Sequence, residues 1–69
     1  MINVSEIKAY MARRDDMTNK ELAEKIGTSQ ATLARWFDKK DMPTSAAEKM
    51  IDVLKIPVSE AIQIFFMAM

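Results

Sequence analysis

Apolar residues recur at helical spacing along most of the chain. Between residues 44 and 57, Ala47, Met50, Ile51 and Leu54 follow the i, i+3, i+4, i+7 rhythm of a helix with one buried face. The single glycine and the two prolines fall between such segments. The pattern predicts an all-α fold of five helices, in residues 3–14, 18–26, 28–37, 44–56 and 58–69.

Capping boxes mark the starts of the first two helices. Asn3 with Glu6, and Thr18 with Glu21, each place a polar N-cap three residues before a glutamate. In such a box each side chain bonds the backbone N–H of the other residue. We therefore expect one helix from Asn3 to about Arg14 and a second that begins at Thr18.

A tight turn follows the second helix. Gly27 comes directly after Ile26, at a position where glycine readily adopts the left-handed backbone that ends a helix. Thr28 is expected to cap the third helix, which continues through Phe37 and ends before Pro43. Residues 18–37 are thus predicted to form two short helices joined by a short turn.

Thr44 or Ser45 is expected to cap the fourth helix, which ends before Pro57. Ser45 and Glu48 have the spacing of a third capping box. Since proline cannot continue a helix ladder, Pro57 separates this helix from the C-terminal segment.

The C-terminal segment, residues 58–69, is strongly apolar and suits a strand as well as a helix. We favour a helix, because Ser59 provides a cap. The stripe expected to face the core is Val58, Ile62, Phe65 and Met69. A second apolar stripe needs another partner, and a dimer contact is expected at Ala61, Ile64, Phe66 and Ala68. A frayed chain end is the alternative.

Composition narrows the class of protein. Its 69 residues suit one small domain, expected to cover residues 1–69. The absence of cysteine and histidine removes disulfides and the commonest metal ligand and general base. We expect no metal, no cofactor, no small-molecule substrate and no enzymatic activity. With neither a secretory signal nor an apolar run of roughly 20 residues, a cytoplasmic protein without a membrane segment is expected.

The exposed start of the third helix fits the major groove of DNA. The amide of Gln30 matches adenine, and the guanidinium fork of Arg35 matches guanine or two phosphate oxygens. The methyl group of Ala31 suits a thymine methyl, and the hydroxyl of Ser29 suits a base or a phosphate. We expect base contacts from Ser29, Gln30, Ala31 and Arg35.

Residues around this helix are expected to contact the DNA backbone. Asn19 and the first amides of the second helix present the positive end of a helix dipole to a phosphate. Lys39 and Lys40 follow the third helix and reach the sugar-phosphate chain. A solvated lysine pair, and an ion pair of Arg35 with Asp38, are the ordinary alternatives. The expected backbone contacts are Asn19, Lys20, Thr28, Thr32, Lys39 and Lys40.

The segment ELAEKIGTSQATLARW resembles the helix-turn-helix of the Cro and phage-repressor family, the XRE-like regulators. That family has an alanine in the second helix, a glycine at the turn, a serine or threonine opening the recognition helix and an apolar residue later in it. Ala23, Gly27, Ser29 and Leu33 occupy these positions. The resemblance extends over about residues 3–56.

The resemblance implies a lambda-repressor-like fold and a sequence-specific transcriptional regulator that reads double-stranded DNA. Relatives commonly bind palindromic operators as dimers, so it also implies a homodimer, without cofactor or catalysis. The family's base-contacting positions fall on Ser29, Gln30, Ala31 and Arg35, and Lys40 matches a backbone-contacting position. The phosphate-contacting glutamine of the family corresponds to Asn19, which is shorter.

Net charge is the one feature that does not favour DNA binding. Ten basic residues balance ten acidic ones, whereas DNA-binding domains are often basic. The alternative function is therefore a protein-interaction module, antitoxin-like or anti-repressor-like, on the same scaffold. If the chain does bind DNA, its neutral charge makes a second copy important for affinity.

Overall fold

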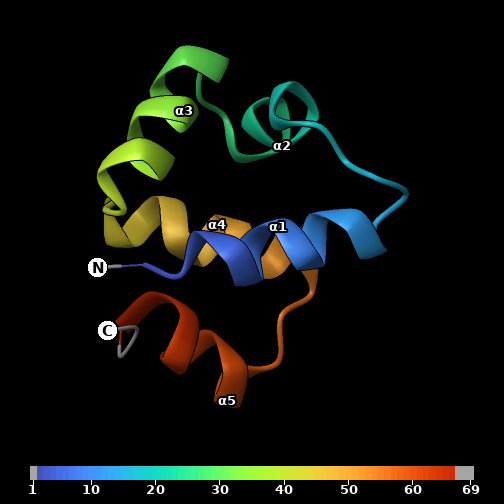
Figure 1. Ribbon diagram of the computed structural model, residues 1–69, viewed down its shortest axis with the longest axis vertical. Coiled ribbons are helices and arrows are strands. Elements are labelled where there is room, and N and C mark those ends of the chain that lie inside the picture. The colour runs from blue at the N-terminus through green and yellow to red at the C-terminus, as the bar shows by residue number, and fades with distance from the viewer. Residues whose placement is uncertain (1, 67–69) are drawn as a thin grey trace.

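The computed structural model describes residues 2–66, which form helices and contain no strand (Figure 1). The elements are α1 (Val4–Arg13), α2 (Asn19–Ile26), α3 (Gln30–Lys39), α4 (Thr44–Leu54) and α5 (Val58–Ala61), which continues as a π-helical turn, η1 (Ile62–Phe66). The predicted all-α fold with five helices is confirmed. The C-terminal segment is helical through Phe66, as favoured over a strand.

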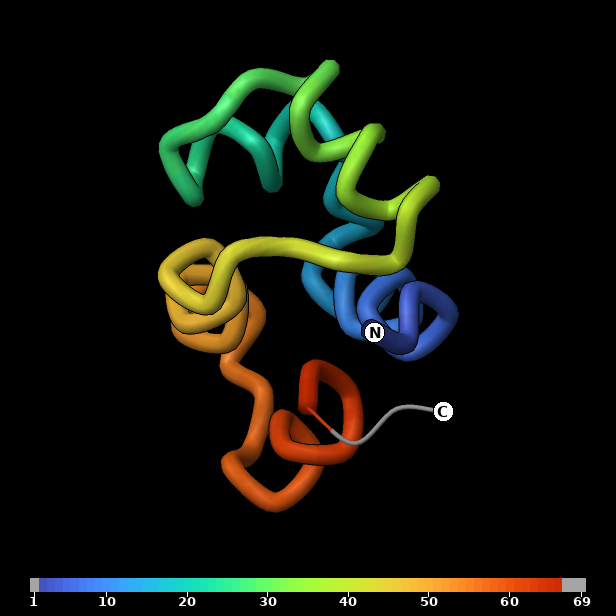
Figure 2. Tube along the Cα trace, turned by 90° about the vertical axis from the view of Figure 1, so that its left-hand side faces the viewer, coloured from blue at the N-terminus to red at the C-terminus, as the bar shows by residue number. Residues whose placement is uncertain are grey.

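The helices are arranged in three levels. Figure 1 shows α2 and α3 together at one end, α1 and α4 between, and α5 at the other end. Figure 2, turned by 90°, shows the same order. α2 packs against both α3 and α4, and α1 packs against η1. The helix pair formed by residues 18–37 is therefore at the end of the molecule opposite the C-terminal helix.

One cluster of buried apolar side chains joins the three levels. Its largest fully buried members are Ile7, Leu22, Leu33, Met50 and Leu54, which come from α1, α2, α3 and α4. Full burial of such a side chain contributes about 1.5–3 kcal/mol. Among residues 2–66 no charged side chain is buried, so the core is held by apolar packing.

Side chains of α1 tie it to α4 and α5. The Arg14 Nε donates to the carbonyl oxygen of Leu54 at 3.1 Å, which satisfies a free carbonyl at the end of α4. The Tyr10 hydroxyl donates to the carboxylate of Glu60 on α5. The guanidinium of Arg13 lies 4.9 Å from the centre of the Tyr10 ring, in cation–π geometry. Of these contacts, the Tyr10–Glu60 hydrogen bond joins α1 to α5.

The N-caps predicted at Asn3 and Thr18 are confirmed, but the capping box predicted at Asn3 is incomplete, because the N–H of Asn3 donates to the carbonyl of Ile64 at 2.8 Å instead of to Glu6. The side chain of Asn3 accepts the backbone N–H of Glu6 at 3.2 Å. Thr18 and Glu21 form the complete capping box, with both reciprocal hydrogen bonds present. Both starts were predictable because a side-chain cap depends on residues only three positions apart.

The predicted N-caps of the last two helices are wrong by one or two residues. The N-caps are Pro43 and Pro57, with ψ of 146° and 145°, and neither makes a side-chain cap bond. A proline with extended ψ directs the next residue into the first helical turn. Thr44 is therefore already helical, Ser45 does not cap α4, and Ser59 lies inside α5 rather than at its cap.

The two apolar faces of the C-terminal helix differ from those predicted: of the predicted core stripe Phe65 is buried, but Val58 and Ile62 are exposed. Ala61, Ile64 and Phe65 are 4%, 3% and 5% exposed, whereas Val58, Ile62 and Phe66 are 75%, 43% and 57% exposed. Ala61 and Ile64 belong to the buried core cluster, and the Tyr10–Glu60 hydrogen bond joins α5 to α1. Assigning Ala61 and Ile64 to a dimer contact was therefore wrong, while Phe66 is exposed. Ala68 and Met69 lie outside the described residues.

No helix within residues 2–66 is long and apolar enough to cross a membrane.

Candidate nucleic-acid interface

The turn between α2 and α3 is a Schellman motif. Gly27 has φ 79° and ψ 34°, in the left-handed region that favours glycine. The N–H of Thr28 donates to the carbonyl of Ala23 at 2.9 Å, and the N–H of Gly27 donates to that of Glu24 at 3.2 Å. The glycine turn is confirmed. Because Thr28 belongs to the end of α2, its predicted role as the cap of α3 is wrong.

Ser29 is the cap of α3. Its hydroxyl accepts the backbone N–H of Thr32 at 3.1 Å and donates to the Thr32 Oγ1 at 2.8 Å. The proton of the Ser29 hydroxyl is thus occupied, which leaves one lone pair as an acceptor. The Thr32 hydroxyl keeps its own proton and can donate it to another group.

The outward face of α3 combines small and polar side chains. Gln30, Ala31, Ala34 and Arg35 are all exposed, at the spacing of neighbours on one helical face. The sequence did not single out Ala34, although residues three and four apart share a helical face and Ala34 follows Ala31 by three positions and Gln30 by four. On the opposite face, Leu33 and Phe37 are 0% and 8% exposed. A smooth face with two hydrogen-bonding side chains is therefore held rigidly on the core.

The far end of α3 is fixed by backbone hydrogen bonds. Lys40 has φ 56°, in the left-handed region, and its N–H donates to the carbonyl of Phe37 at 3.3 Å. The N–H of Asp41 donates to the carbonyl of Trp36 at 3.1 Å, which completes a second Schellman motif. The N–H of Ile2 donates to the carbonyl of Lys40 at 2.9 Å. The side chains of Lys39 and Lys40 are both exposed at this end.

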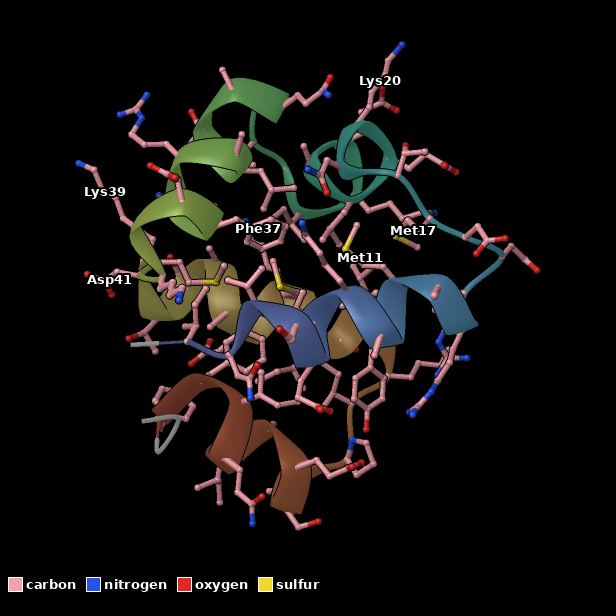
Figure 3. All side chains as sticks on the ribbon, in the orientation of Figure 1. Met11, Met17, Lys20, Phe37, Lys39 and Asp41 are labelled. Carbon is pink, nitrogen blue, oxygen red and sulfur yellow. The ribbon has the colours of Figure 1, made fainter. Side chains whose placement is uncertain are left out.

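The start of α2 presents free backbone donors. The N–H of Glu21 is taken by Thr18, and the N–H of Leu22 donates to the Thr18 carbonyl at 3.0 Å. The peptide N–H groups of Asn19 and Lys20 precede the first intrahelical bond, so they have no partner within the helix. Figure 3 shows Lys20 projecting from α2 at the same end of the molecule as α3. This arrangement suits an anion.

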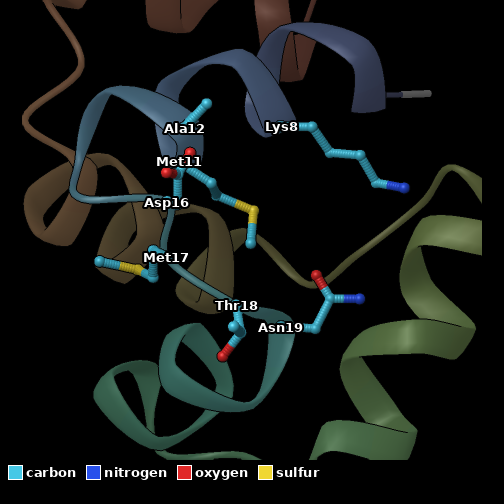
Figure 4. Close-up of a pocket in the computed structure, with 7 residues that line it drawn as sticks. All are labelled: Lys8, Met11, Ala12, Asp16, Met17, Thr18 and Asn19. Carbon is cyan, nitrogen blue, oxygen red and sulfur yellow. The ribbon is translucent and has the colours of Figure 1, made fainter.

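A pocket of about 250 Å³ opens between α1 and the start of α2 (Figure 4). Its lining includes Lys8 and Ala12 from α1 and Asn19 from α2. In Figure 4 the side chains of Lys8 and Asn19 extend on the same side of the pocket. Lys8 was missed by the sequence analysis, because it lies outside the helix-turn-helix and only the packing of α1 brings it there.

Acidic residues border this surface. Asp15 and Asp16 have φ of 59° and 53°, and both are exposed in the connection from α1 to α2. Asp38 and Asp41 are exposed near the end of α3. Because exposed charges are screened beyond about 10 Å at 0.1 M salt, each acid mainly weakens the field of its near neighbours.

The ten residues predicted to contact DNA thus lie on α2, on α3 or at their ends. The predicted base contacts Gln30, Ala31 and Arg35 share the exposed face of α3, and Ser29 caps it. Within residues 2–66 no group of three or more acidic residues is arranged to hold a metal ion.

The family model described as Helix-turn-helix matches residues 7–60. The match begins in α1, includes the whole α2–α3 pair and ends in α5. No curated protein and no solved structure matches the chain.

Proposed function

Since the chain belongs to the Cro/C1-type, XRE-like helix-turn-helix family of non-catalytic DNA-binding domains, we propose that it regulates transcription by binding a specific operator through α3. The outward face of α3 carries this proposal. Gln30 and Arg35 lie on this face, and the exposed residues beside them there are alanines. On the opposite side of the helix, Leu33 and Phe37 are buried in the core. Major-groove recognition needs such a rigidly held helix with few, directed polar groups.

The proposed base contacts differ in strength. Gln30 donates and accepts at the edge of an adenine, and Arg35 donates two hydrogen bonds to a guanine. Ala31, together with the neighbouring Ala34, allows close approach and meets a thymine methyl. Ser29 contributes least, because its hydroxyl already donates to Thr32 and retains only acceptor capacity.

The proposed backbone contacts surround the recognition helix. The peptide N–H groups of Asn19 and Lys20 bind one phosphate at the start of α2, and we add Lys8 of α1 to this contact. Lys39, the last residue of α3, and Lys40, its C-cap, bind phosphates at the end of that helix. Thr28 and Thr32 are only half-buried, so their hydroxyls can reach the DNA backbone between these two groups of phosphate contacts.

We further propose a single domain over residues 1–69 that acts as a homodimer on a palindromic operator. Repression by occupancy is the simplest mode for so small a regulator, because a bound dimer blocks access to the DNA it covers. The neutral net charge supports the need for two copies, since one copy gains little nonspecific attraction from phosphates. A regulator of this kind is expected in the cytoplasm, where it meets its operator.

Selection of bound sites from a random DNA pool tests this function. The expected result is a palindromic consensus whose half-sites lie about one helical turn, near 34 Å, apart. A protein shown to be folded that enriches no sequence would contradict the proposal.

A protein-interaction module is the second candidate, and the exposed stripe of Val58, Ile62 and Phe66 favours it. A salt titration separates the two. Each phosphate contact lowers the slope of log affinity against log salt by about 0.9, whereas an apolar protein contact gives little salt dependence. A flat salt profile with a protein partner would favour the module.

A further inference from the structure

All the sulfur in this chain belongs to methionine, since the sequence has seven methionines and no cysteine. Within residues 2–66, Met11 and Met50 are 4% and 0% exposed, so they are shielded from solvent. Met17 and Met42 are only partly buried, and both pack against the core. Of the thioethers within these residues, those of Met17 and Met42 are therefore the ones that a small reagent in solution can reach.

Met17 lies at the start of α2. It lines the pocket between α1 and α2 together with Lys8 and Asn19 (Figure 4). Its N–H donates to the carbonyl of Met11 at 3.0 Å. The next residue, Thr18, is the N-cap of α2. A change in the packing of Met17 therefore displaces this cap and the free amides proposed to bind a phosphate.

Met42 has the corresponding place at the end of α3. A shallow groove of about 390 Å³ lies there, and Met42 lines it together with Trp36 and Lys39. The residue before Met42 is Asp41, whose N–H closes the end of α3 by donating to the Trp36 carbonyl. A change in the packing of Met42 therefore displaces the end of α3 and the lysine side chains proposed to bind phosphates there.

The two accessible methionines lie at the two ends of the α2–α3 pair. In Figure 1 the start of α2 is on the right and the end of α3 is on the left. Oxidation converts the flexible apolar thioether of methionine into a polar, chiral sulfoxide, which disrupts apolar packing. A polar group held against an apolar core without a hydrogen-bond partner is unfavourable, so the sulfoxide moves toward water. Oxidation at both positions would therefore loosen both ends of the surface proposed to bind DNA.

We propose that Met17 and Met42 are oxidation sites for a hydroperoxide, and that their conversion to sulfoxides weakens DNA binding. With hydrogen peroxide, a lone pair on the sulfur attacks one oxygen, so that an S–O bond forms while the O–O bond breaks. The sulfur is oxidised by two electrons, and the departing hydroxide takes the proton of the transferred oxygen and leaves as water. Methionine sulfoxide reductases reverse this change, so the protein can return to its DNA-binding form.

Two matched double variants of the full chain test the inference, which rests on the proposed function for its effect on DNA. Met17→Leu with Met42→Leu removes the two accessible thioethers, and Met11→Leu with Met50→Leu removes two buried ones. Leucine has a volume close to that of methionine and is tolerated in cores. Both variants keep the methionines outside residues 2–66, so any effect of those is common to all the proteins.

Each protein is treated with dilute hydrogen peroxide. Peptide mass spectrometry locates the added oxygen, circular dichroism checks that the protein is folded, and a gel-shift assay on the selected operator measures affinity. In the wild type and in the buried-pair variant, Met17 and Met42 are expected to be oxidised first. The DNA dissociation constant is expected to rise by about tenfold or more, and the unfolding midpoint to fall by about 4–8 °C. The variant without Met17 and Met42 is expected to keep both values.

The single tryptophan provides a local readout for one of the two sites. Trp36 lines the same groove as Met42, so its fluorescence should change on oxidation in the wild type. In Met42→Leu alone, the fluorescence should stay constant while Met17 is still oxidised.

Three results would overturn the inference. The first is oxygen that appears on Met11 or Met50 before Met17 and Met42. The second is an oxidised wild type with unchanged affinity, and the third is an equal loss of affinity in Met17→Leu with Met42→Leu. Failure of the proposed function is distinguishable, because the chain would then prefer no DNA sequence before oxidation, whereas failure of this inference leaves that preference intact.

Discussion

Ser29 and Thr32 bond each other twice at the start of α3, through the Thr32 N–H to the Ser29 Oγ at 3.1 Å and through the Ser29 hydroxyl to the Thr32 Oγ1 at 2.8 Å. This pair sets where α3 begins. Ser29, which was expected to contact a base, therefore has a structural role as the N-cap of this helix.

Replacing Ser29 separates capping from DNA contact. Ser29→Ala removes the cap and is expected to lower the free energy of unfolding by about 1 kcal/mol. Ser29→Asp keeps a capping oxygen, so its stability should stay near that of the wild type, while its charge weakens DNA binding. Chemical denaturation and a gel-shift assay measure the two effects. Equal stability of Ser29→Ala and the wild type would show that the Thr32 bonds contribute nothing.

Arg35→Ala is expected to weaken specific binding by about 1–3 kcal/mol and to relax sequence preference at one base pair, because a bidentate contact is lost. Lys40→Ala, which removes a backbone contact, is the comparison and should weaken all sequences alike. Competition gel shifts with single-base operator variants give both quantities. Unchanged affinity and preference in Arg35→Ala would remove α3 from the role of recognition helix.

Lys8→Ala is expected to weaken binding to all sequences and to reduce the salt slope by about 1, since a cation beside the start of α2 is lost. Removal of the Lys55 charge is the control, because Lys55 lies away from this surface, at the end of α4 where the chain leaves toward α5 (Figure 1). Identical salt slopes for Lys8→Ala and the wild type would exclude Lys8 from the phosphate contact.

Lys55→Gly is expected to stabilise the protein by up to about 1 kcal/mol. Lys55 ends α4 with φ 54°, where a side chain costs roughly 1–2 kcal/mol, partly offset by the freedom glycine adds to the unfolded chain. Gly27→Ala makes the opposite change and should destabilise the protein, because a side chain at φ 79° is strained even though a Cβ there meets no atom within 4 Å. Thermal unfolding of both variants measures this. A less stable Lys55→Gly would contradict it.

Stability is expected to fall at alkaline pH because of Tyr10. Its hydrogen bond to the Glu60 carboxylate raises the pKa of Tyr10 above the ordinary value of 10.0. The folded protein therefore holds this proton more tightly than the unfolded chain. The contribution is complete below pH 10.0 and is lost as the pH rises through the raised pKa. Denaturation from about pH 8 to about pH 11 should show a smaller decline in Tyr10→Phe. An equal decline in both proteins would rule out this linkage.

Features that depend on near neighbours in the sequence were predictable. The capping box of Thr18 and Glu21 and the turn at Gly27 each involve only a few consecutive residues, and the structure confirms both. The exposure of Gln30 and Arg35 followed from helical spacing against the buried Leu33. The start of α3 was misplaced by one residue, since the motif that ends α2 also uses Thr28.

The amino-acid sequence by itself determined the helices, the turn and the residues offered by the recognition helix, because local hydrogen bonding and periodicity decide them. The tertiary structure alone decided which apolar residues of the C-terminal helix are buried. Helical spacing offers more than one apolar face there, and contacts between distant parts of the chain, such as that of Tyr10 with Glu60, 50 residues apart, are not encoded in that spacing. The tertiary structure likewise placed Lys8 of α1 and Asn19 of α2 at one pocket, because proximity between separate helices is not encoded in the spacing within either one.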